Sequence, residues 1–250
     1  MLETSYQLSK VNVSESVPTI RSVPFLEGKL DRRSMSLLVE TAGVVVAAIL
    51  IIRFFLASAI SREAWLVIPG IWVAAALIPT AMKGRKFTPI GLSLVQMRRS
   101  LTVLGYTCVV LFPGMFLVCW LSKSFGLELP LRPALPQVQA WIPWLVYQFM
   151  YIAVAEEVFF RGYVQSNILK LAYTLKLGRC SLQSGASIVI SAAVFAVAHI
   201  IIQGQLISAL TFFPGLIFGW VFIRTKSLSA PILLHGLANT LYCILPAIFT

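Results

Sequence analysis

Acidic residues are scarce in this chain of 250 residues, since Asp and Glu together number nine against 20 Lys and Arg. Histidine occurs twice, and cysteine four times without a Cys-x-x-Cys pair, so neither a disulfide framework nor a cysteine zinc cluster is implied. A His-Glu-x-x-His zinc motif and a glycine-rich nucleotide loop are also missing. The first 35 residues contain no apolar signal-like run, and we expect no cleaved signal peptide there.

What the chain has in excess is apolar surface. It is 58% hydrophobic and only 12% charged, with a mean hydropathy of +0.88. Apolar runs of about 20 residues, the length a helix needs to cross the hydrocarbon, recur along it. The sequence therefore predicts an all-α polytopic membrane protein with about seven (six to eight) transmembrane helices enclosing an intramembrane polar site. The expected helices cover 36–60, 64–81, 101–122, 140–156, 185–203, 206–223 and 229–248.

The net charge of +11 is distributed as membrane topology requires. If the N-terminus is cytosolic, 16 of the 20 Lys and Arg fall in cytosolic segments, which agrees with the positive-inside rule. We therefore expect a cytosolic N-terminus, an outer C-terminus and a lipid bilayer as partner, with no nucleic acid. Compact loops and the lack of organelle signals favour a prokaryotic inner membrane. The sequence does not indicate an oligomeric state.

The stretch AEEVFFRGY places three charged residues inside an apolar segment. Neighbouring helical residues point about 100° apart, so Glu156 and Glu157 face different ways. Glu157 and Arg161 are four residues apart, with the acid first, which favours an ion pair. Glu156 has no basic residue at helical spacing. The pattern predicts a structural pair beside one carboxylate that needs a partner elsewhere.

Both histidines of the chain also lie in apolar spans. His199 stands in SAAVFAVAHII and His235 in LLHGLANT, one turn before Asn239. A shared polar cavity with Glu156 would satisfy all four side chains, and ionisable residues at membrane depth usually mark function. A carboxylate can act as general base on water, and an imidazole or amide can donate to an oxyanion. Two His and one Glu also form a catalytic zinc set, so zinc is an alternative.

These motifs resemble the CAAX protease and bacteriocin-processing family, also called the Abi family, whose members are glutamic-type intramembrane endopeptidases. Three motifs stand in the family's order, and they use the only two histidines of the chain. The motifs are Glu-Glu-x-x-x-Arg (Glu156, Glu157, Arg161), Phe-x-x-x-His (Phe195, His199) and His-x-x-x-Asn (His235, Asn239).

The resemblance implies catalytic roles for four residues. Glu156 would activate the hydrolytic water with help from His199, while His235 and Asn239 would stabilise the oxyanion. It implies supporting roles for the remaining motif residues: Glu157 and Arg161 would orient the helix, and Phe195 would pack nearby. No cofactor is implied, and the expected substrate is a membrane-associated or hydrophobic peptide. The alternatives are a zinc-dependent membrane protease and a non-enzymatic immunity or transport protein.

Composition, the apolar spans and, for the last part, the resemblance together predict three parts of the chain. Residues 1–35 form a flexible cytosolic tail, 36–139 form membrane helices without a motif, and 140–250 form the catalytic membrane core. One difficulty concerns depth, because simple alternation of helices places His199 toward the opposite side of the membrane from Glu156. Either the fourth helix continues far beyond Glu156, or the turn at 203–205 is buried inside the protein. We favour the long helix.

Overall fold

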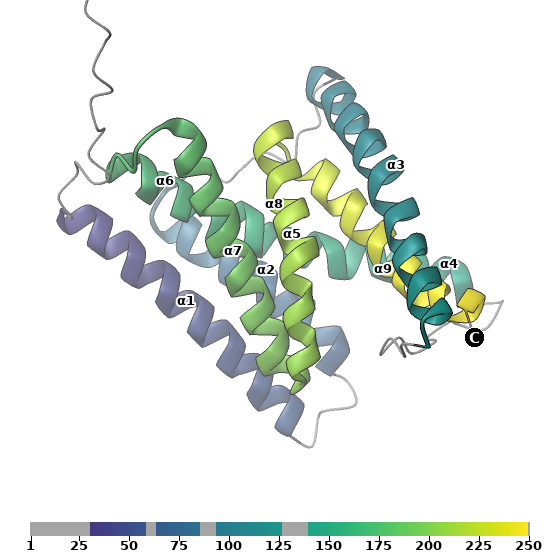
Figure 1. The fold of residues 1–250 in the computed structure, drawn as a ribbon. Helices are drawn as coiled ribbons and strands as arrows, with labels where there is room; N and C mark the ends of the chain where they lie inside the picture. Colours follow the sequence, from purple (N-terminus) through teal and green to yellow (C-terminus); the bar gives the residue numbers. More distant parts are fainter. Residues whose placement is uncertain (1–30, 59–63, 86–93, 127–139, 250) are drawn as a thin grey trace, which may run out of the picture.

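The computed structural model describes residues 31–58, 64–85, 94–126 and 140–249, and in these residues the regular structure is wholly helical (Figure 1). The N-terminal helices are α1 (Arg32–Ala57), α2 (Ala64–Met82) and α3 (Leu94–Ser124). The segments α4 (Trp141–Val146), η3 (Tyr147–Ala153), α5 (Val154–Glu157), η4 (Val158–Gln165) and α6 (Ser166–Thr174) follow without a break. The last are α7 (Cys180–Gln203), η5 (Leu206–Thr211), α8 (Phe212–Thr225) and α9 (Ser229–Phe249).

The predicted fold class is confirmed. Counting the uninterrupted α4–α6 run as one helix and η5 with α8 as another, the described residues form seven helices. Four are long and apolar enough to cross a membrane, namely Arg32–Ala57, Gln96–Ser124, Cys180–Gln203 and Leu206–Thr225. Shorter apolar helices cover Leu66–Met82 and Ser229–Leu245. The chain is an integral, polytopic membrane protein.

The fourth helix differs most from its predicted range of 140–156, because it continues to Thr174. We refer to Trp141–Thr174 as the long helix. The predicted range leaves Arg161 beyond the end of the fourth helix, but Arg161 belongs to the long helix and its side chain is completely buried in the protein. A charged residue can stay at that depth because Glu157 neutralises it. The prediction that the fourth helix is long is confirmed, and residues 203–205 are exposed rather than buried. The depth of Glu156 in the membrane stays a prediction.

The other boundaries differ by fewer residues. α3 begins at Leu94 instead of 101, and α7 at Cys180 instead of 185. α1 begins at Arg32, where the Asp31 carboxylate accepts a hydrogen bond from the Ser34 backbone N–H at 2.8 Å. Helices can extend past the apolar core into the aqueous boundary, so hydropathy alone shortens them. Most of the predicted tail, residues 1–30, lies outside the described residues.

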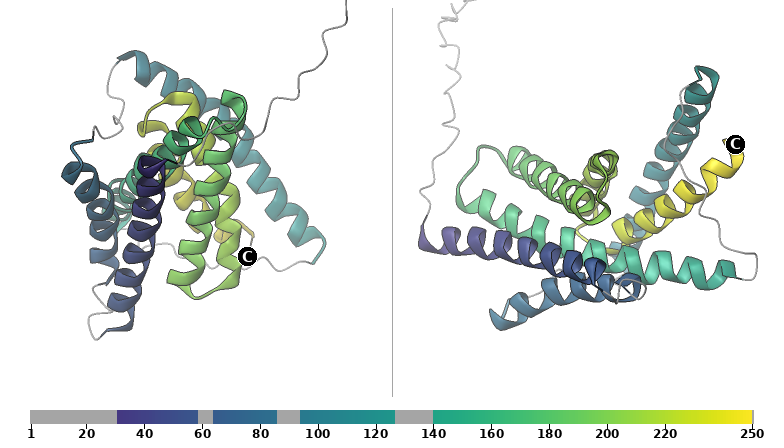
Figure 2. Two further views of the ribbon diagram at one scale, coloured as in Figure 1. Left: turned by 90° about the vertical axis from the view of Figure 1, so that its left-hand side faces the viewer. Right: turned by 90° about the horizontal axis from the view of Figure 1, so that it is seen from below.

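Two apolar clusters hold the helices together. The larger joins α1, α2, the long helix and α7, with Trp72 packed 4.6 Å from Phe159 between ring centroids. The smaller joins α3, α8 and α9 around Phe218 and Leu234. Seen from below, the long helix runs across the molecule, with α3 and α9 side by side near one end (Figure 2). Phe195 of the larger cluster and Phe218 of the smaller cluster both contact the His235 ring.

Candidate active site

Two π-helical segments of the long helix, η3 and η4, flank the four residues that contain Glu156 and Glu157. π-Helical turns are rare and are frequent at functional sites. The wider turn of η4 is stabilised from outside and inside. Ser191 of α7 donates to the Phe160 carbonyl at 3.0 Å, and the Ser166 hydroxyl donates to the Arg161 carbonyl five residues earlier.

Arg161 lies between a carboxylate, a carbonyl and two aromatic rings. One guanidinium nitrogen donates to Glu157 at 3.0 Å and the other to the Gly215 carbonyl of α8 at 3.2 Å. Its guanidinium carbon lies 4.7 Å from the Phe195 ring centroid and 5.3 Å from that of Phe218. The buried guanidinium is thus stabilised by two cation–π contacts and by the ion pair with Glu157 that the sequence predicted.

One turn further along, Gln165 donates to the Gly219 carbonyl at 3.1 Å. Gly215 and Gly219 permit this approach, because a Cβ at Gly219 would lie 3.0 Å from Gln165 Oε1 and one at Gly215 only 3.2 Å from the Ala192 backbone. We call Glu157, Arg161, Gln165, Gly215 and Gly219 the packed seam. It fixes the long helix against α8.

Glu156 faces the histidines. Its Oε2 atom lies 3.8 Å from His199 Nε2 and 3.7 Å from His235 Nε2, and it is buried without a hydrogen-bond partner. The structure therefore brings together the three ionisable residues that the sequence analysis assigned to one cavity, from the long helix, α7 and α9. A buried oxygen without a protein donor is a site where water or a substrate proton can bind.

The proton positions of both histidines follow from their second nitrogen. His199 Nδ1 lies 2.9 Å from the Phe195 carbonyl, which can only accept, so Nδ1 carries the proton. His235 Nδ1 lies 2.7 Å from Glu157, whose carboxylate is paired with Arg161 and also accepts. Neutral His199 and His235 consequently both present a bare Nε2 toward Glu156. Three acceptor atoms converge on one point.

Asn239 lies one turn beyond His235 on α9. Its Nδ2 atom donates to Gln148 Oε1 of the long helix at 3.3 Å. Asn239, His199 and His235 line a cavity of about 570 Å³ together with Phe195 and Phe218. The Phe218 ring stacks on the His235 imidazole with a centroid distance of 4.8 Å. The candidate site is thus open on one side to a space large enough for part of a peptide.

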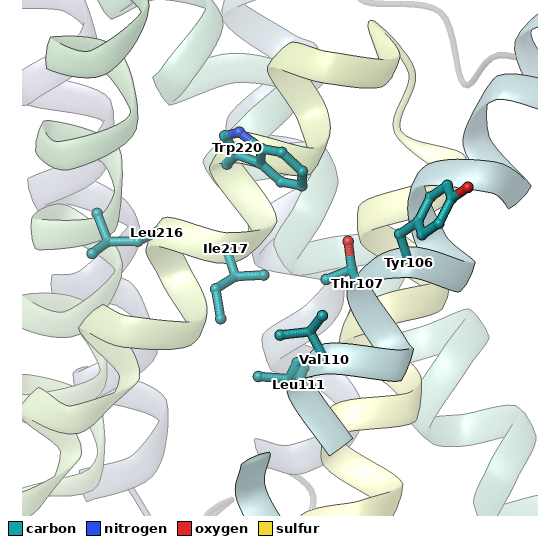
Figure 3. Close-up of a pocket in the computed structure, with 7 residues that line it drawn as sticks. All are labelled: Tyr106, Thr107, Val110, Leu111, Leu216, Ile217 and Trp220. Carbon is teal, nitrogen blue, oxygen red and sulfur yellow. The ribbon is translucent and has the colours of Figure 1, made fainter. Parts of the chain in front are cut away.

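The cavity has a polar and an apolar part. Its polar wall comes from the turn after α7 and from η5, and includes Gln203, Gln205, Ser208 and Thr211. Its apolar wall includes Leu111, Met115, Leu210, Phe213 and Ile217. A second, almost wholly apolar groove of about 530 Å³ lies between α3 and α8, where the side chains of the two helices face each other (Figure 3). It shares Leu111 and Ile217 with the cavity.

Two contacts of this site were not foreseen from the sequence. The first is the hydrogen bond that joins Glu157 to His235, which makes Glu157 more than a partner of Arg161. The second is the hydrogen bond from Asn239 to Gln148. Gln148 is a polar residue in an apolar run, which is the one feature of the sequence that could have pointed to it. Among the described residues, no group of three or more His, Cys, Asp or Glu side chains is arranged to hold a metal ion.

Comparison with known proteins assigns the segment that contains this site. Residues 138–241 match the sequence model of the Rce1-like type II CAAX prenyl endopeptidases. No curated protein and no solved structure matches the chain. The matched segment holds all three motifs, the packed seam and most of the cavity wall. Through this segment, the chain is similar to the Rce1-like family of CAAX prenyl endopeptidases, which are membrane proteases.

Proposed function

We propose that the protein is an intramembrane endopeptidase that hydrolyses a peptide bond of a membrane-associated or hydrophobic substrate with a water activated by Glu156. The observation that carries the proposal is the buried Glu156 Oε2 atom without a donor, 3.7 and 3.8 Å from two imidazole nitrogens. We call Glu156, together with three residues that line the cavity (His199, His235 and Asn239), the cavity cluster. Residues 140–250 would form the catalytic core, and 36–139 supporting helices.

The converging acceptors suit a water molecule, which has two protons to donate. One O–H of the water would donate a hydrogen bond to Glu156, and the other would donate one to an Nε2 atom of a histidine. Glu156 takes its proton as the water oxygen attacks the scissile carbonyl, so that a C–O bond forms while the O–H electron pair stays on oxygen. The ion pair of Glu157 with Arg161 keeps His235 in the tautomer that accepts a hydrogen bond at Nε2.

The oxyanion formed in this step requires donors. Asn239 can supply an amide N–H in every protonation state, whereas His235 can donate from Nε2 only in its doubly protonated form, which this step does not generate. Collapse of the intermediate breaks the C–N bond, and the leaving nitrogen takes the proton held by Glu156. This step restores the Glu156 carboxylate and releases a product with a free α-amine. His199 Nε2 lies 3.8 Å from Glu156 Oε2, which is too far for a direct hydrogen bond, so a bridging water would have to carry a proton between them.

The composition of the cavity supports an apolar peptide as substrate. Its polar lining residues at the end of α7 and in η5 offer hydrogen-bond partners for an extended backbone, and its other lining residues are mostly aliphatic and aromatic. The family name describes cleavage of prenylated CAAX proteins, and an S-prenylated peptide is accordingly the first substrate to test. The cytosolic N-terminus and the prokaryotic inner membrane remain predictions.

The decisive experiment compares the purified wild-type protein with Glu156→Gln in liposomes. The probe is an internally quenched peptide ending in an S-prenylated Cys-aliphatic-aliphatic-X sequence, alongside the same peptide without the lipid. We expect cleavage by the wild type and a loss of about 10²–10⁴-fold in Glu156→Gln, since a carboxamide cannot accept the proton. Cleavage that survives either this substitution or His199→Ala contradicts the proposal.

The same assay separates the zinc alternative. Proteolysis through Glu156 and water persists after dialysis against a chelator, with no zinc remaining at the level of one ion per chain. Activity that is lost to the chelator and restored by zinc would instead assign Glu156, His199 and His235 as ligands. For native substrates, Glu156→Gln expressed in the source cell serves as a trap whose retained peptides are identified by mass spectrometry.

A further inference from the structure

We infer that Gln148 positions the carboxamide of Asn239. Gln148 accepts a hydrogen bond from one N–H of this carboxamide, so that the second N–H is presented to the substrate carbonyl. This inference rests on the proposed function, because it concerns the oxyanion donor of that mechanism. Gln148 belongs to none of the three motifs. It stands eight residues before Glu156, in the π-helical segment η3.

The hydrogen bond with Gln148 restricts rotation of the Asn239 carboxamide, the proposed oxyanion donor. The Asn239 Nδ2 atom donates to Gln148 Oε1 at 3.3 Å, and a carboxamide nitrogen has two N–H bonds at a fixed angle. A side-chain amide without such a partner rotates broadly about its last bond. Once one N–H is held by Gln148, the plane of the amide and the direction of the second N–H are set. Donors contribute most to catalysis when they are fixed before charge develops.

Gln148 can perform this role because its own segment is held on two sides. On one side the Phe149 ring lies directly against Gly236, where an added Cβ would come within 2.4 Å of it. On the other side the Tyr151 hydroxyl donates to the Leu66 carbonyl of α2. The segment η3 therefore cannot move away from α9 without losing contacts with two helices.

The two helices also cross in a direction that makes the contact specific. On α9, His235 meets Glu157, and one turn later Asn239 meets Gln148, which lies earlier on the long helix. The antiparallel crossing thus pairs each polar residue of the His-x-x-x-Asn motif with one polar residue of the long helix. Glu157 orients the imidazole, and Gln148 does the same for the amide.

An ordinary interhelical hydrogen bond would stabilise the fold without affecting the chemistry, and kinetics can distinguish the two roles. Gln148→Met keeps the length of the side chain and removes the strong acceptor, while Gln148→Glu retains an acceptor. Both are compared with Met150→Leu, an exposed position on the same segment. Each change is made in the wild type and in Asn239→Ala, with the S-prenylated peptide as probe and unfolding in mixed micelles as a second measurement.

We expect Gln148→Met to lower kcat about 10- to 100-fold with KM unchanged, and Gln148→Glu to keep most of the activity. In Asn239→Ala, Gln148→Met should cause no further loss. Equal losses in both backgrounds, or a folded Gln148→Met with normal kcat, would overturn the inference. So would additive effects of the two substitutions on unfolding, which would show that the side chains do not interact. Glu156→Gln in the same assay tests the proposed function separately, because only its failure removes the mechanism itself.

Discussion

The packed seam and the cavity cluster each contain one of two adjacent glutamates, Glu157 and Glu156. The packed seam holds helices together, whereas we propose that the cavity cluster performs the chemistry. Glu157 is completely buried, and its Oε1 atom accepts from both Arg161 and His235, while its Oε2 atom has no hydrogen-bond partner. Glu156 is partly exposed, with its Oε2 atom also unpartnered at 3.7 Å from His235. The ion pair with Arg161 commits Glu157 to a helix contact, while Glu156, which faces two histidines instead, can take a proton. Stability and activity should therefore depend on different residues.

The largest effect on stability is expected for Glu157→Gln. Removing one partner of a buried ion pair leaves the Arg161 charge uncompensated, and such changes typically cost about 3–5 kcal/mol of unfolding free energy. The carboxamide oxygen that replaces the carboxylate still accepts from His235 Nδ1, so the imidazole keeps its tautomer and residual activity at low temperature should persist. Unfolding by dodecyl sulfate in mixed micelles measures the loss.

The matched control for that change is the double variant Glu157→Gln with Arg161→Met. Removing both charges should restore a large share of the stability, because no unpaired buried ion remains. If Glu157→Gln instead leaves stability unchanged and abolishes activity, the division between the packed seam and the cavity cluster is wrong.

The converse effect is expected for Asn239→Ala in the cavity cluster. Loss of one oxyanion donor reduces kcat about 10²- to 10³-fold, equivalent to roughly 2.7–4 kcal/mol in the barrier. Asn239 is only partly buried, so unfolding should change by less than about 1 kcal/mol. Steady-state kinetics in liposomes check the first expectation, and a folded variant with normal kcat would remove Asn239 from the mechanism.

The four residues of the cavity cluster and the Glu157–Arg161 pair of the packed seam could be proposed from the sequence, but the contact of Gln165 with Gly219 could not. Helical spacing alone separated Glu157 and Arg161 from Glu156, because positions four apart share a face. The apolar spans of His199 and His235 suggested a common cavity, and the structure places both beside Glu156. Charges at membrane depth are costly, so each one carries more information than it would in a soluble protein.

The π-helical segments and the role of Gln148 could not be predicted in this way. A π turn depends on partners from other helices, such as the Ser191 hydroxyl on the Phe160 carbonyl, which sequence spacing does not reveal. Hydropathy likewise ended the fourth helix near Glu156, since it scores Arg161 as exposed whatever its partners are. The π turn and the true end of the fourth helix both depend on contacts between residues far apart in the sequence.

Gly236→Ala should affect stability and activity together, because Gly236 lies between His235 and Asn239 at the boundary of the two regions. A Cβ there would come within 2.4 Å of the Phe149 ring and force α9 away from η3. Overpacking of this kind costs about 1–3 kcal/mol. Gly185→Ala on α7 is the control, since nothing lies within 4 Å of its added Cβ. Loss of stability without loss of kcat would show that the cavity cluster tolerates movement of α9.

Ser191→Ala should have the smallest effect and should be confined to stability. Its hydroxyl donates from α7 to the Phe160 carbonyl of η4 at 3.0 Å, and interhelical hydrogen bonds in membranes contribute about 0.6 kcal/mol on average. Ser187→Ala is matched in burial and helix, but the Ser187 hydroxyl bonds to the Ser184 carbonyl of its own helix, so its loss should matter less. Because η4 places Arg161 and not Glu156 directly, kcat should stay within about twofold of the wild type in both variants, as a change of about 0.4 kcal/mol or less in the barrier implies. A large fall in kcat for Ser191→Ala alone would mean that the π turn tunes the position of Glu156, and that the packed seam contributes to catalysis through geometry.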